Sequence, residues 1–165
     1  MTDITLNIEN GYFIYRVGAI IIHDNKVLMV KNDRSPYYYS VGGRVGFGET
    51  SESAVLREAF EETGVDFEID RLAFIHENIF HGDFFNNALC HEISFYYLMK
   101  QNENSNTAKG GSLGINGVTE SLHWLRLDEL PGLHLYPEFY KTELQNLKNE
   151  VGHFITMNEH TIRAG

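Results

Sequence analysis

Residues 43–65 read GRVGFGETSESAVLREAFEETGV and join a glycine-rich segment to an uninterrupted helical stretch. The three glycines before residue 49 permit backbone turns that other residues resist, which predicts a structured loop. Thr50 is a favoured N-cap residue, and no Gly or Pro follows it until Gly64, which is suited to end a helix. The segment therefore predicts a loop followed by a helix that ends at Thr63.

Three carboxylates lie on one face of this expected helix. Glu58 and Glu62 are four residues apart, and Glu61 follows Glu58 by three, so 100° per residue brings all three together. Like charges repel there, whereas a hard divalent cation with oxygen ligands makes the cluster favourable. The pattern therefore indicates Mg²⁺ or Mn²⁺, although a solvated acidic face is the usual explanation for such a run when it stands alone.

The segment resembles the Nudix hydrolase signature G-x5-E-x7-R-E-U-x-E-E-x-G-U, in which U is apolar. The match has no gap, and seven fixed positions would agree by chance in a chain of this size about once in a million. The resemblance implies an α/β fold, an α/β/α sandwich with a mixed central β-sheet. The fixed positions are Gly43, Glu49, Arg57, Glu58, Glu61, Glu62 and Gly64.

The resemblance also implies a ligand set for the metal. Glu58 and Glu62 would be the main side-chain ligands, and the carbonyl of Gly43 a backbone ligand. Glu61 would bind directly or through water, and Mg²⁺ or Mn²⁺ would be the cofactor.

Arg57 and Glu49 have a structural role in this interpretation. Arg57 cannot bind a metal, but it can reach back to Glu49 and fix the loop against the helix. The simpler alternative is a surface ion pair worth under about 1 kcal/mol. The packed face of the helix would consist of Ala54, Val55, Ala59 and Phe60.

The reaction implied is hydrolysis of a nucleoside diphosphate linked to another moiety, as in a nucleotide, a nucleotide sugar or a dinucleotide, by attack of water at phosphorus. Phosphoryl transfer depends on charge neutralisation and in-line positioning, which a metal held by carboxylates provides. Markers of particular substrates are missing, since Phe80 stands where ADP-ribose hydrolases carry proline. Aromatic residues near the box suit either base stacking or edge packing: Tyr37, Tyr38, Tyr39, Phe80, Phe84 and Phe85.

A general base is expected from outside the helix, because metal-bound carboxylates are poor proton acceptors. Glu120 closes the long Gly/Asn-rich loop of residues 101–118, where a lid could bring it over bound substrate. Glu92 and Glu103 are the rivals, and a solvated loop acid is an equally good explanation of Glu120.

Composition limits the other possibilities. With 165 residues the chain fits one domain, residues 1–165, and its 13 Lys and Arg against 23 Asp and Glu give a net charge of −10. This charge disfavours nucleic acid and anionic lipid as partners, and no apolar run reaches the about 18 residues that span a bilayer. The N-terminus does not resemble a signal peptide, so a cytoplasmic protein is expected, and its oligomeric state is open, a homodimer included.

Two functions of other classes remain as alternatives. A noncatalytic nucleotide sensor on the same fold would show erosion of the acidic positions and a DNA-binding appendix, and neither is present. A Nudix-like isomerase would need a reactive thiol, whereas Cys90, the single cysteine, lies in an apolar stretch.

Secondary structure outside the box follows from residue type and periodicity. Two short strands at 12–22 and 26–31 are expected to form a hairpin. Further strands are expected at 66–76, 90–100 and 122–127. A helix should begin at Pro137 and run to Val151, because apolar residues recur there at helical spacing.

Overall fold

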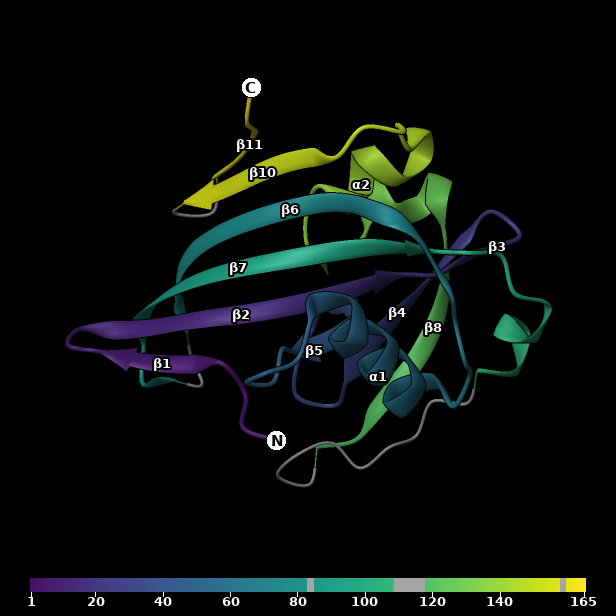
Figure 1. Cartoon of the computed structure of the whole chain (residues 1–165). Helices are drawn as coiled ribbons and strands as arrows, with labels where there is room; N and C mark the ends of the chain where they lie inside the picture. Colours follow the sequence, from purple (N-terminus) through teal and green to yellow (C-terminus); the bar gives the residue numbers. More distant parts are fainter. Residues whose placement is uncertain (83–84, 109–117, 158–159) are drawn as a thin grey trace.

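The protein is described by a computed structural model that covers residues 1–82, 85–108, 118–157 and 160–165. A mixed sheet dominates it, with the strand order β11-β10-β6-β7-β2-β5-β4-β3 (Figure 1). The pairs β2/β7, β6/β10 and β5/β9 are parallel, and the others are antiparallel. The strands are β1 (Thr5–Ile8), β2 (Gly11–Ile20), β3 (Ile22–His23), β4 (Lys26–Asn32), β5 (Tyr38–Arg44), β6 (Ile69–Gly82), β7 (Ala88–Met99), β8 (Glu120–Arg126), β9 (Leu135–Tyr136), β10 (Gly152–Met157) and β11 (His160–Arg163).

The main helix, α1 (Ser51–Thr63), has the predicted boundaries. The Thr50 side chain accepts a hydrogen bond from the backbone N–H of Ser53, and Gly64 ends the helix in the left-handed conformation at φ 71°. Both positions satisfy backbone groups that a helix end leaves without partners. The local sequence is therefore sufficient to define this helix.

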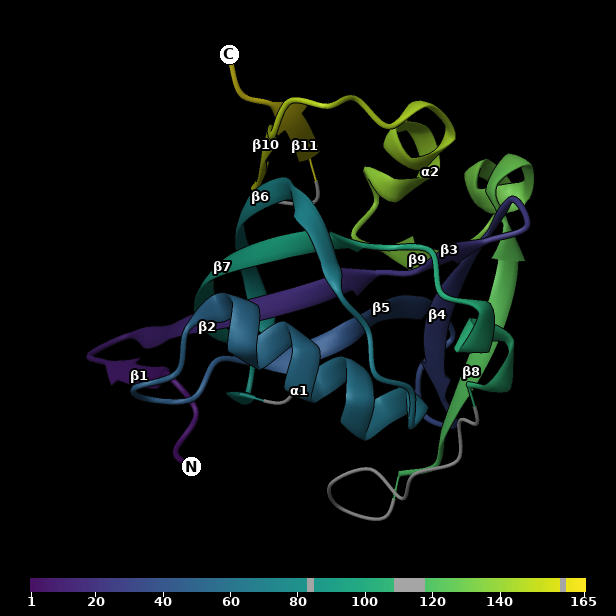
Figure 2. The same ribbon diagram turned by 45° about the vertical axis from the view of Figure 1, so that its right-hand side comes forward.

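Helical elements cover both faces of the sheet, and the fold is an α/β sandwich. Helix α1 packs on one face, where Ala54, Val55 and Ala59 are fully buried against residues of β2 and β7. The short helix α2 (Tyr140–Glu143) packs on the other face, together with the 3₁₀ helices η3 (Leu127–Gly132) and η4 (Leu144–Asn146). Figure 2 shows the two helices on opposite sides of the strands.

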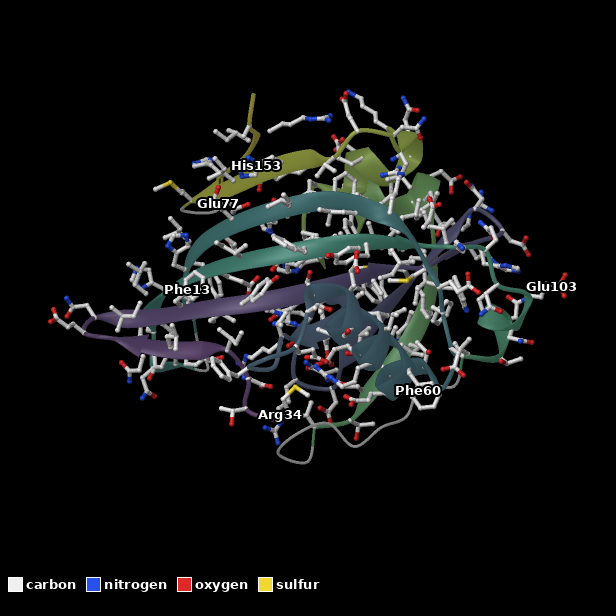
Figure 3. All side chains as sticks on the ribbon, viewed as in Figure 1. Phe13, Arg34, Phe60, Glu77, Glu103 and His153 are labelled. Carbon is white, nitrogen blue, oxygen red and sulfur yellow. The ribbon has the colours of Figure 1, made fainter. Side chains whose placement is uncertain are left out.

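The buried face of α1 differs from the prediction at one position. Phe60 is 49% exposed, whereas Thr63 is buried. Figure 3 shows Phe60 pointing away from the sheet. The face of the helix that packs on the strands carries the small residues Ala54 and Ala59, and the larger ring of Phe60 lies on the outer side.

Strand β5 changes partners along its length. At Val41–Arg44 it pairs with β2, and at Tyr39–Ser40 it pairs with β4. Strand β8 pairs with β4, so it belongs to the second half of the sheet. The backbone of Gly42 and Gly43 therefore lies where the two halves meet, directly beneath α1.

Several segments differ from the sequence-based prediction. The helix expected from Pro137 to Val151 is limited to α2 and η4, and Val151 is exposed just before β10. Pairing of β10 with β6 requires an extended chain here, so tertiary contacts outweigh the helical spacing. Strands β1, β5, β9, β10 and β11 were not predicted, and Gly43, expected in a loop, lies in β5. Of the expected lid at 101–118, residues 109–117 lie outside the described residues, and Glu103–Thr107 form the 3₁₀ helix η2.

None of the helices in the described ranges is long and apolar enough to span a membrane.

Candidate active site

Arg57 holds the glycine-rich loop against α1. Its Nε donates to Glu49 Oε1 at 2.9 Å and its Nη2 to Glu49 Oε2 at 3.0 Å, which is a two-pronged ion pair. Nη2 also donates to the carbonyl of Arg44 at 3.1 Å. Because the Glu49 side chain is only 6% exposed, this pair is not the surface ion pair of the simpler explanation.

Hydrogen bonds from Arg57 and from the backbone stabilise the negative charge of Glu49. Hydrogen bonds from Arg57 lower the pKa of Glu49, and the backbone N–H of Gly46 donates to Oε2 at 2.9 Å. Conversely, the hydrogen bonds to Glu49 raise the pKa of Arg57. The pair is therefore charged at all ordinary pH values and fixes the loop to the helix.

Glu58 lies against the backbone of β5. A Cβ atom placed on Gly43 would come within 2.4 Å of the Glu58 carboxyl group, so only glycine leaves room for it. Burial raises the pKa of Glu58, although Arg57 Nη1 donates to Oε1 at 2.7 Å and acts in the opposite direction. The requirement for glycine thus comes from a close approach between this backbone and a candidate metal ligand.

Glu62 lies beside the same strand, and its negative charge is poorly compensated by hydrogen bonds. From the described residues its two oxygens accept only long contacts of 3.4 Å, both from the backbone N–H of Gly42. Burial raises the pKa of Glu62 to about 8, and the negative charges of Glu120 and Glu58 add to this effect. A desolvated carboxylate beside two others is stabilised by a nearby cation.

The donor chemistry of these residues fits a hard divalent metal, because carboxylate and backbone carbonyl oxygens are the ligands such ions prefer. The Glu58 and Glu62 carboxylates flank the backbone of Gly42 and Gly43, and no closely placed donor for Glu62 is found in the described part of the chain. Within the described ranges, however, no three His, Cys, Asp or Glu side chains are grouped closely enough to hold an ion together. Glu58 would have to leave Arg57 for a metal to use both of its oxygens.

The remaining acidic candidates occupy different places. Glu61 is on the outer flank of α1, 56% exposed, where Arg57 Nη1 donates to it at 3.3 Å. Glu120 begins β8 and accepts a 2.7 Å hydrogen bond from the Tyr39 hydroxyl. Its charge acts on Glu62, so the structure brings Glu120 near the box helix.

The two rivals of Glu120 are elsewhere. Glu103 lies on η2, and Figure 3 shows it at the outer rim, directed into solvent. Glu92 is buried in β7, where the Ser94 hydroxyl donates to it at 2.9 Å. Its nearest cation is Arg16, with Nε and Oε2 4.0 Å apart.

Two interactions near the site were not predicted. Arg16 of β2 influences both Glu58 and Glu62 electrostatically, and Tyr39 holds Glu120. No sequence signal distinguishes Arg16 from any charged residue in an alternating strand. The contact of Tyr39 depends on β4 and β8 pairing across about ninety residues of chain, which local patterns do not report.

The aromatic residues near the box form two groups in the described part of the chain. Tyr37 packs edge-on against Tyr39 and Tyr136, with ring centroids 6.5 and 5.0 Å apart. Phe85 lies 4.3 Å from the Tyr12 ring, and the Arg44 guanidinium lies 5.8 Å from the Phe85 centroid. Phe84 lies outside the described residues.

Comparison with known proteins agrees with this geometry. The sequence model of the NUDIX domain matches residues 13–147. An ADP-ribose pyrophosphatase of Methanocaldococcus jannaschii is 46% identical over 52 residues, which cover 30% of this chain and only 31% of that protein. A putative 8-oxo-dGTP diphosphatase of Bacillus subtilis is 28% identical over 144 residues, covering 82% of each chain.

The solved structure of a MutT protein from Bacillus halodurans has the same fold, with a TM-score of 0.66 and 19% identity over 88% of this chain and 92% of that one. The domain match covers well over half of the chain and contains the whole arrangement of loop, helix and carboxylates described above. The chain therefore belongs to the Nudix hydrolase family and is an enzyme of that family.

Proposed function

We propose that the protein is a Mg²⁺-dependent pyrophosphohydrolase that cleaves a nucleoside diphosphate linked to another moiety. The observation that carries this proposal is the half-buried Glu62 carboxylate, whose pKa is raised by burial and by the charges of Glu120 and Glu58, and whose hydrogen bonds within the described residues are long backbone contacts. Such an arrangement is costly by itself and becomes favourable when a cation is shared. A noncatalytic sensor would have no need to keep it.

Glu58, Glu62 and the carbonyl of Gly43 would hold the metal, and Glu61 would contribute through water. Bound there, the cation would neutralise charge on the two phosphates and acidify a water molecule. Arg57 and Glu49 would keep the loop that carries Gly43 in register with the helix. These residues supply the positioning on which phosphoryl transfer depends.

Glu120 is the proposed general base. It lies across from the helix on β8, close enough for its charge to influence Glu62, and the Tyr39 hydroxyl fixes its orientation at 2.7 Å. With Mg²⁺ saturating, Glu120→Gln should lose turnover while metal affinity persists. Glu103→Gln should be silent, and a dead Glu92→Gln or Glu103→Gln variant beside an active Glu120→Gln variant would show that the base is another carboxylate.

The substrate is to be sought among compounds with a diphosphate. The relatives named above are an ADP-ribose pyrophosphatase and a putative 8-oxo-dGTP diphosphatase, so both compound classes belong in the test. We would incubate the protein with Mg²⁺ and a panel of nucleotides, nucleotide sugars, dinucleotides and ADP-ribose, and identify products by mass spectrometry. Cleavage of none of them would contradict the proposal.

The metal site has its own test. Glu58→Gln and Glu62→Gln should each lower turnover at least about 100-fold, because a hard-metal ligand loses its charge. Glu52→Gln, in the first turn of the same helix, is the matched control and should keep full activity. Activity that survives EDTA, or survives in both ligand variants, would exclude the catalytic assignment.

A further inference from the structure

Arg16 is an arginine with unused hydrogen-bonding capacity. It lies on β2 between the buried residues Ile14 and Val17, and its side chain is 37% exposed. Among the described residues its guanidinium makes no hydrogen bond. The one ion pair it makes there, with Glu92, has Nε and Oε2 4.0 Å apart. Five N–H donors in a rigid fork are therefore available to an acceptor from outside.

The surroundings of Arg16 are negatively charged. Burial acts to lower the pKa of Arg16, but Glu92 and, further on, Glu62 and Glu58 act against it, and the resulting pKa is above the ordinary value. The guanidinium is thus within electrostatic range of the two candidate metal ligands. It is one of few cations placed there in a chain of net charge −10.

The backbone between Arg16 and these glutamates has no side chains. Arg16 pairs with Arg44 across β2 and β5, and the next pairs are Val17 with Gly43 and Gly18 with Gly42. Directly paired residues project from the same face, and so do residues two apart on one strand. Arg16 and Gly42 therefore share a face as diagonal neighbours, and the N–H of Gly42 faces Glu62. Arg16 alternates with Val17, which packs against α1, so its side chain leaves the sheet on the face opposite the helix, and the backbone of Gly42, which carries no side chain, lies between it and Glu62.

We propose that Arg16 is a substrate-binding residue that donates hydrogen bonds to phosphate oxygens of the diphosphate, across Gly42 from Glu58 and Glu62. This inference rests on the proposed function, because it assumes that the diphosphate lies at those glutamates. A planar guanidinium suits a phosphate, which offers two acceptor oxygens to its fork. The metal and Arg16 would then neutralise the substrate from two sides.

A purely structural role for Arg16 fits the contacts less well. Glu92 already accepts a 2.9 Å hydrogen bond from Ser94 through Oε1, and its other oxygen remains 4.0 Å from Arg16. An arginine that served only to neutralise Glu92 would be expected to close this gap. Glu92 instead holds the guanidinium nearby and leaves its donors free.

The test uses imidodiphosphate, a diphosphate that carries no nucleoside, so it does not depend on knowing the base. In the presence of Mg²⁺, Arg16→Met should weaken imidodiphosphate binding, measured by calorimetry, at least 10-fold. The imidodiphosphate affinity of Arg16→Lys should lie between those of Arg16→Met and the wild type, because lysine keeps the charge but not the planar guanidinium. For a substrate found in the panel, the KM of Arg16→Met should rise and its melting temperature should stay close to the wild-type value.

Arg126→Met is the matched control, since Arg126 lies at the end of β8 and its guanidinium is already bonded to Asp128 at 2.7 Å. It should bind imidodiphosphate as the wild type does. Arg16→Met could fail to fold because Glu92 is left unpaired. In that case the double variant Arg16→Met/Glu92→Gln, which removes both charges, takes the place of Arg16→Met in the binding measurement. Normal hydrolysis and normal imidodiphosphate affinity in the Arg16 variants would overturn this inference and leave the proposed function intact. A wild type that hydrolyses nothing in the panel would instead count against the proposed function.

Discussion

At the scale of single residues, Glu62 should make the stability of the metal-free protein depend on pH. Its pKa in the folded state, about 8, is above the ordinary 4.5, so the folded state binds this proton more tightly than the unfolded state. The contribution to stability is fully present below about pH 4.5 and is lost as the pH rises through 8. In EDTA, the melting temperature should fall over this range.

Glu62→Gln is the variant that isolates this effect, because the amide does not titrate. Its melting temperature in EDTA should change less between pH 5 and pH 8.5 than that of the wild type, and at pH 8.5 it should be the higher of the two. Parallel curves for both proteins would show that Glu62 is not desolvated as described.

Cys90 should be chemically inert in the folded protein. The residue is fully buried on β7, burial raises the pKa of its thiol, and its Sγ makes a weak 3.6 Å contact with the carbonyl of Ala88. Cys90→Ala should keep hydrolytic activity, and the wild-type thiol should react with a disulfide reagent only on unfolding. Loss of activity in a folded Cys90→Ala protein would favour a thiol-dependent reaction.

At the scale of elements, the contact between β5 and α1 predicts a specific effect at Gly43. Gly43→Ala would place a Cβ atom 2.4 Å from the Glu58 carboxyl group, so the carboxylate must move. We expect turnover to fall at least about 10-fold, since misplaced catalytic groups are costly, and metal affinity to weaken. Gly132→Ala is the control, because its Cβ would meet nothing within 4 Å. Equal activity in the two variants would contradict the close approach.

The elements also show which parts of the structure follow from the sequence. Helix α1 was predicted with both ends because Thr50 and Gly64 act locally. The turn at Asp24 and Asn25 was predicted too, since both residues suit positive φ. The strand expected at 12–22 is divided, however: β2 pairs with β5 and β7, and only β3 pairs with β4 in the hairpin. The second helix was predicted too long and strand β10 was missed, because that strand depends on its pairing with β6, far away in the sequence, and with β11.

The same division holds for the candidate site: its local part could be predicted from the sequence, and its long-range contacts could not. The box residues are close in sequence, so their spacing placed the glutamates and Arg57 correctly on the loop and helix, whereas Gly43, expected in the loop, lies in β5. The sequence offered Glu92 only as a rival base, and its burial in β7 together with Ser94 did not follow from any local pattern. The position of Arg16 beside them depends on parallel pairing of β2 with β7, a long-range contact that periodicity does not specify.

At the scale of the whole molecule, Mg²⁺ should stabilise the fold. A ligand that binds only the folded state raises stability by mass action, by about 2.7 kcal/mol at 100 times its dissociation constant. For a chain of this size that corresponds to roughly 5–10 °C in melting temperature. Millimolar Mg²⁺ should therefore raise the melting temperature at pH 8, EDTA should reverse the rise, and Glu62→Gln should abolish it. No shift in the wild type would show that the site does not bind Mg²⁺.

The change of partners along β5 has a consequence for how such an enzyme can be adapted. The helix that carries the proposed metal ligands packs over the half of the sheet that contains β2, whereas Glu120, the proposed base, is carried by β8 in the half that contains β4. The proposed metal ligands and the proposed base therefore lie on opposite sides of the line where the two halves meet, and β5 pairs with both halves. Substitutions in β8 or in the core beneath it can retune the distance between base and phosphorus while leaving the metal ligands untouched. The reaction can thus be preserved while its geometry is adjusted to substrates of different size.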